Sequence, residues 1–230
     1  MIARALAALV PLTTVVALAP PAQAAPLPAK EVLTQTRHAD VDGDGRSDTV
    51  RLYKAGKTGD NTIWKVKVTT AAGRSSSVAI KIPSYRSLTG LYGWANLDGR
   101  RGAEVLLSPE TDDFEIYLVL TWRGGALHRE LAPLGPGDGT KRQNYWETPS
   151  EIDRRGYRFS TSSGHRYVNT WYATCPGQPD KPGRCTVRTV RSVWRDGDWH
   201  KVAVLPTTKV ANSAIYARHV FGALKIHSWH

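Results

Sequence analysis

The sequence predicts an all-β protein built from antiparallel hairpins, on three observations. Runs such as "TIWKVKVTT" alternate apolar and polar residues, which places Trp64, Val66 and Val68 on one face of a strand. Gly, Pro, Asn and Asp separate these runs at intervals of about 8–12 residues, a spacing typical of sandwiches and propellers. Two hairpin patterns also recur along the chain. We therefore expect blade-like β-meander units that form a partial or small propeller-like assembly, or a sandwich.

The chain begins with the layout of a secretory signal peptide at residues 1–24. One positive residue, Arg4, precedes an apolar run from Ala5 to Ala19, and the small residues Ala22 and Ala24 follow it. This order predicts cleavage after Ala24 and a secreted, extracellular protein. A membrane anchor is the alternative, and the short apolar run with its accompanying prolines argues against it.

The next element is an acidic loop, "ADVDGDGRSD", at residues 39–48. Position 6 of the loop is Gly45, and the carboxylates at positions 1, 3, 5 and 9 are Asp40, Asp42, Asp44 and Asp48. Side chains at odd positions of a tight loop converge, and clustered carboxylates repel one another unless a cation lies among them. Oxygen ligands without His or Cys favour calcium. We predict one Ca²⁺ site, to which Arg46 adds its carbonyl; the alternative is an acidic turn that only solvates a hairpin.

This loop resembles the calcium loop of the FG-GAP/VCBS-type repeat, which is also found in the propellers of integrin α-subunits. The shared pattern is Asp-x-Asp-Gly-Asp-Gly-x-x-Asp followed directly by a strand, here "TVRLY". In that family the loop joins two strands of a blade and binds calcium. The resemblance implies the same ligand set, which is Asp40, Asp42, Asp44, Asp48 and the carbonyl of Arg46. An EF-hand is excluded because position 12 is Arg51, inside the predicted strand.

A second, weaker copy of the loop lies in "ANLDGRRGAE" at residues 95–104. Asn96, Asp98 and Glu104 occupy positions 1, 3 and 9, but Arg100 replaces the position-5 carboxylate. A guanidinium at that position can pair with Asp98 or Glu104 and take the place of the cation. We therefore expect the second loop to hold no metal.

Another recurring pattern predicts two similar hairpins. "VLTWRGGALHREL" at 119–131 resembles "SVWRDGDWHKVAV" at 192–204. Their turns, Gly124-Gly125 and Asp196-Gly197, suit tight hairpins that need positive φ. The first hairpin extends the mostly apolar run "FEIYLVLTW", which predicts a strand buried more deeply than its neighbours.

A long polar segment at 133–152 connects an N-terminal β region, 25–132, to a C-terminal β region, 153–230, and the two regions are expected to be separate or one continuous domain. Cys175 and Cys185 flank a segment rich in Pro and Gly. In an oxidising compartment they are expected to form a disulfide at the tip of a hairpin. The tail at 212–230 fits both a helical stripe and a strand face, and Gly222 weakens the helical option.

Charge and aromatic content indicate the class of partner. The net charge is +11, and the chain has eight Trp and nine Tyr. Outside a cell such a protein meets anionic polymers, cell-wall glycans, acidic protein surfaces and nucleic acid. Lys65 and Lys67 share a strand face that Lys81 extends, which makes them the candidate basic face. We expect a monomer that does not insert into membranes.

The sequence lacks catalytic motifs, so we predict a secreted, calcium-stabilised, non-enzymatic binding or structural module. One alternative is a secreted hydrolase of polysaccharide or another polymer, using paired carboxylates in the segment Glu110–Glu115. The other is a secreted inhibitor of an acidic partner.

Overall fold

The computed structural model describes residues 30–109, 116–147, 153–176, 182–216, 221–222 and 224–229. Its regular structure is almost entirely antiparallel β-strand, with one five-residue helix, so the predicted all-β class is confirmed. The expected signal peptide at 1–24 and the segment Glu110–Glu115 lie outside the described residues, as does part of the predicted connection at 133–152.

The first sheet is a four-stranded meander in the order β1-β2-β3-β4. Its strands are β1 (Val32–Ala39), β2 (Asp48–Thr58), β3 (Asn61–Thr69) and β4 (Ser75–Pro83). The alternating pattern of the sequence forms two faces, because Val66 and Val68 are fully buried while Lys65 and Lys67 point to the other side. Lys81 lies on the lysine-bearing face as well, since it pairs with Ile63, which precedes Lys65 by two residues.

The middle sheet contains a second meander, and the C-terminal end of the chain adds an edge strand to it. The meander consists of β5 (Leu88–Ala95), β6 (Glu104–Pro109), β7 (Ile116–Arg123) and β8 (Ala126–Glu130). The short strand β9 (Trp146–Glu147) pairs with β7, and β15 (His227–Ser228) pairs with β5. His227 stacks on Trp94 of β5, and Trp229 donates from its ring nitrogen to the carbonyl of His38 in β1.

The third sheet repeats the meander with β10 (Asp153–Ser162), β11 (His165–Thr174), β12 (Arg184–Arg195) and β13 (Asp198–Ala211), and β14 (Phe221–Gly222) lies at its edge. The disulfide Cys175–Cys185 is formed and joins the end of β11 to the start of β12, as predicted. The tail combines both sequence interpretations, because the helix α1 (Asn212–Tyr216) is followed by the two short strands.

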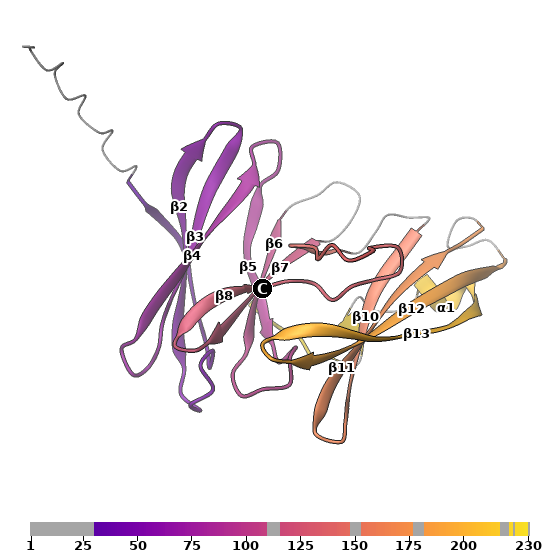
Figure 1. The fold of residues 1–230 in the computed structure, drawn as a ribbon. Helices are drawn as coiled ribbons and strands as arrows, with labels where there is room; N and C mark the ends of the chain where they lie inside the picture. The colour runs from indigo at the N-terminus through magenta and orange to yellow at the C-terminus, as the bar shows by residue number, and fades with distance from the viewer. Residues whose placement is uncertain are drawn as a thin grey trace, which may run out of the picture.

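The three sheets stand side by side, with the middle sheet between the other two (Figure 1), and β15 lies at the edge of the middle sheet. One apolar core fills the junction of the first and middle sheets, and a second core fills the junction of the middle and third sheets. Successive side chains of β7 pack in different cores. Leu118 and Leu120 pack in the first core. Tyr117 and Val119 pack in the second. This two-sided burial explains why β7 is apolar throughout.

The two similar hairpins of the sequence form as expected. Arg123 pairs with Ala126 across the β7–β8 turn, and Arg195 pairs with Asp198 across the β12–β13 turn. All four turn residues, Gly124, Gly125, Asp196 and Gly197, have positive φ. The matching geometry follows from local sequence, since this turn type needs positive φ at both central residues.

Candidate metal centre

The predicted calcium loop is the turn between β1 and β2. Ala39 pairs with Asp48, so the eight residues between them form a closed loop at the end of the hairpin. Gly43 and Gly45 have φ of 79° and 84°, which are conformations that side chains with a Cβ rarely adopt. These two glycines therefore allow the chain to turn back on itself twice within the loop.

Asp48 is the buried anchor of the loop. Its Oδ2 accepts hydrogen bonds from the backbone N–H groups of Val41 and Asp42, at 2.8 and 3.1 Å. Its Oδ1 accepts from the N–H of Ala71, in the turn between β3 and β4. Three backbone donors thus hold a fully buried carboxylate in one position.

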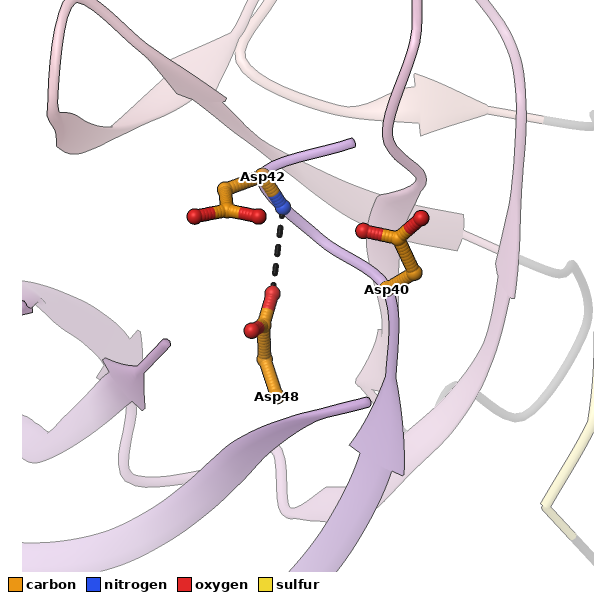
Figure 2. A group of neighbouring side chains, drawn as sticks. All are labelled: Asp40, Asp42 and Asp48. Atoms are coloured by element: carbon orange, nitrogen blue, oxygen red, sulfur yellow. Dashed lines mark hydrogen bonds between the residues drawn. The ribbon is translucent and has the colours of Figure 1, made fainter. Parts of the chain in front are cut away.

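Asp40 and Asp42 complete a group of three carboxylates with Asp48. One oxygen from each of the three lies within 4.8 Å of the others, a separation that a single metal ion could bridge (Figure 2). Asp40 accepts from the N–H groups of Gly43 and Gly45, at 2.8 and 3.0 Å. The backbone of the loop therefore orients these carboxylates.

The fourth predicted carboxylate, Asp44, lies outside this group. It forms an ion pair with the side chain of Arg46, at 2.6 Å, and accepts the N–H of Arg46 as well. These hydrogen bonds lower the pKa of Asp44. Asp44 would have to release Arg46 in order to coordinate an ion bound by the other three.

One cation that the sequence did not reveal, Arg74, neutralises only part of the negative charge of the loop. Arg74, in the turn between β3 and β4, donates to Asp42 at 2.9 Å. The Asp44–Arg46 pair is neutral, so the three grouped carboxylates and Arg74 together carry two negative charges. Arg74 is 58% exposed and free to move aside, whereas the side chain of Asp42 is almost fully buried.

The loop between β5 and β6 shares its strand pairing and two of its hydrogen bonds with the first loop, 56 residues later. Ala95 pairs with Glu104 as Ala39 pairs with Asp48. Glu104 accepts from the N–H of Leu97, and Asp98 accepts from the N–H of Arg100, as their counterparts do in the first loop. Gly43 and Gly99 have nearly equal φ, 79° and 77°.

A guanidinium does occupy this second loop, but it belongs to Arg123 and not to Arg100, so that assignment was wrong. Arg123 donates to Asp98 through Nε at 3.1 Å and to Glu104 through a terminal nitrogen at 2.9 Å. The side chain of Arg100 is exposed. Arg123 is the last residue of β7, in the β7–β8 hairpin of the same sheet, and Arg74 lies in the turn of the corresponding β3–β4 hairpin of the first sheet.

Glu130, at the end of β8, adds a third buried acid to the second loop. One carboxylate oxygen from Asp98, Glu104 and Glu130 lies within 4.8 Å of the others, so this group also has the spacing of metal ligands. Trp199 of the third sheet donates to Oε1 of Glu130 at 2.9 Å, whereas Oε2 has no hydrogen-bond partner among the described residues. Burial raises the pKa of Glu104 to about 7, and it raises the pKa of Glu130 well above its usual range.

The two loops contact each other directly. The N–H of Ala103 donates to the carbonyl of Asp40 at 2.9 Å. A Cβ on Gly43 would lie 2.6 Å from the backbone carbon of Arg101, so the close approach requires glycine there. Arg166 of β11 reaches the other side of the second loop, where it donates to the carbonyls of Asn96 and Leu97. Both acidic loops therefore lie at the junctions between sheets.

Comparison of the chain with protein-family models, with curated proteins and with solved structures found no match. The resemblance to FG-GAP/VCBS-type repeats therefore stays an expectation that rests on the loop residues. In the part of the chain that the structure describes, no helix is long and apolar enough to cross a membrane.

Proposed function

We propose that the protein is an exported, calcium-stabilised, non-enzymatic binding module for an anionic extracellular partner. The observation that carries the proposal is the group of Asp40, Asp42 and Asp48, held by backbone donors with one oxygen from each within 4.8 Å of the others. A divalent cation would neutralise the two negative charges that Arg74 leaves uncompensated. Oxygen-only ligands favour calcium, as in the FG-GAP-like loop that the sequence resembles.

Two further features support export and binding. The leader-like residues 1–24 fit secretion, and the disulfide Cys175–Cys185 fits an oxidising compartment. A net charge of +11 favours an anionic partner over a cationic one. The calcium ion in this proposal has a structural role, because it would hold the β1–β2 loop, which contacts the middle sheet through Ala103.

Calorimetric titration of the folded protein with calcium tests the proposal. We expect one site with a dissociation constant of about 0.1–1 mM, the range of extracellular modules. A tenfold excess of calcium over that constant should stabilise the native state by about 1.4 kcal/mol. Asp42→Asn should abolish the heat and the thermal shift. Asp60→Asn, which alters an exposed carboxylate in the β2–β3 turn, should leave both unchanged.

The contrary results are equally distinct. Wild-type protein that shows neither heat nor thermal shift at millimolar calcium would identify the loop as an acidic turn. A response that survives Asp42→Asn would place the ion elsewhere. Asp44→Ala measures the cost of breaking the Asp44–Arg46 pair, and we expect it to weaken calcium binding less than Asp42→Asn does.

A further inference from the structure

The outer face of the third sheet contains a basic hollow that the sequence analysis did not identify. Its volume is about 470 Å³, within the range of about 300–1,000 Å³ that is usual for ligand sites. It is lined by His165 and Tyr167 from β11, Arg191, Val193 and Arg195 from β12, and Val202 and Ala203 from β13. None of the described carboxylates lines it.

The register of the strands explains how these residues meet. Tyr167 lies opposite Val193, and Arg191 lies opposite Ala203, so successive odd-numbered residues of β11 and β12 project to the same side. The other side of the sheet packs into the core through residues such as Val168 and Trp194. The hollow therefore lies on the face opposite this core, and a smaller apolar cluster that includes Trp171 and Ile215 covers another part of the same face.

Within the described part of the chain, no acidic side chain neutralises the two arginines of the hollow. Neither forms an ion pair with a described carboxylate. Arg191 lies over the ring of Tyr167, with its guanidinium carbon 4.4 Å from the ring centroid, and its Nε is buried without a hydrogen-bond partner. This cation–π contact orients a planar guanidinium in advance, so less entropy is lost when it binds an anion.

We propose that this hollow binds an acidic sugar, such as one residue of a glycan that carries carboxylate or sulfate groups. The inference deepens the proposed function by naming the surface and the class of partner. Arg191 and Arg195 would contact the oxyanion through charge-assisted hydrogen bonds. Val193, Val202 and Ala203 offer apolar surface to the C–H face of a sugar ring. Single-stranded nucleic acid fits less well, because Arg191 already covers one face of the Tyr167 ring and base stacking needs an open aromatic face.

Calorimetric titration with short oligosaccharides tests this inference in the full chain. The probes are a heparin tetrasaccharide, which carries sulfates and carboxylates, and tetragalacturonate, which carries carboxylates alone. The variant Arg191→Ser/Arg195→Ser should lose about tenfold or more in affinity for whichever probe binds. The charge-matched control Lys54→Ser/Lys57→Ser, which alters two exposed lysines of β2 in the first sheet, should stay within about twofold of wild type.

Further arms separate the alternatives. Arg191→Lys keeps the charge but loses the planar fork, so we expect a clear loss of affinity; full retention would contradict oriented recognition by Arg191. An oligo-dT probe that binds more tightly than either glycan, and depends on the same arginines, would overturn the sugar assignment. If only the lysine variant loses binding, the partner is still anionic, but it does not bind in the hollow. Calcium titration of the same variants tests the metal loop independently. If no probe binds, the sugar-binding proposal is refuted, and the calcium proposal is not affected.

Discussion

At the scale of single residues, the two acidic loops differ in what neutralises them. Both present an aspartate to an arginine from the following hairpin, Arg74 to Asp42 and Arg123 to Asp98. Arg74 is 58% exposed and contacts one carboxylate, whereas the side chain of Arg123 is 21% exposed and contacts two. Arg123 is therefore a built-in cation of the second loop, while the first loop keeps room for an external one.

Replacing Arg123 should be costly for this reason. Arg123→Gln leaves Asp98 and Glu104 buried without their cation, and breaking a buried pair in this way costs about 3–5 kcal/mol. The matched control is Arg100→Gln, whose exposed side chain should change stability by no more than about 0.5 kcal/mol. Urea unfolding at neutral pH measures both. If the two substitutions lowered stability equally, Arg123 would not be the specific cation of the second loop.

At the scale of elements, the contact between the two loops depends on one glycine. Gly43 and Gly45 both have positive φ, but a Cβ on Gly45 would meet no atom within 4 Å, whereas one on Gly43 would strike the backbone of the second loop. Substitution of Gly45 therefore measures only the stability lost to an unfavourable backbone conformation, whereas substitution of Gly43 adds the stability lost to a steric clash.

Alanine substitutions use this difference as a matched pair. Gly45→Ala should destabilise the protein by about 1 kcal/mol, the cost of positive φ alone. Gly43→Ala should cost about 1–3 kcal/mol more, because the loops must move apart. Chemical denaturation in calcium-free buffer provides both values. If the two variants lost the same stability, the loops would not be packed as described.

Local sequence predicted the elements well and the long-range contacts poorly. The alternation in β3, the positive-φ turn of Asp196 and Gly197, and the acidic spacing are all visible within a dozen residues. Arg123 and Glu130 lie 19 and more residues from the carboxylates they meet, and no local pattern marks them. The hollow has the same origin, since Tyr167 and Arg191 are brought together only by strand register.

At the scale of the whole molecule, buried acids connect the middle sheet to the third. Glu130 accepts the ring N–H of Trp199, and Glu104 lies in the same cluster. Burial raises the pKa of both acids, that of Glu104 to about 7 from an ordinary 4.5. The folded protein therefore holds more protons than the unfolded chain between these values.

This difference fixes the sign of a pH dependence. A raised carboxyl pKa contributes stability that is fully present below about pH 4.5 and is lost as the pH rises through about 7. In calcium-free buffer, the contribution of the cluster to the free energy of unfolding should be larger near pH 5 than near pH 8. Glu130→Gln keeps an acceptor for Trp199 but does not titrate, so it should flatten the pH profile of unfolding. An unchanged pH profile in that variant would show that Glu130 does not contribute to the pH dependence of stability.

The pairing of β15 with β5 also has a consequence for the order of folding. Trp229 reaches His38 across 191 positions of sequence, and the whole third sheet is synthesised between them. Contacts this distant form slowly, because a long segment must be ordered before its ends meet. The first two sheets can form their shared core and the contact between Ala103 and Asp40 early, yet the hydrogen bond from Trp229 to β1 forms only after the third sheet exists. We therefore expect a late step of folding to be the docking of the C-terminal segment beside β1, the first strand of the chain.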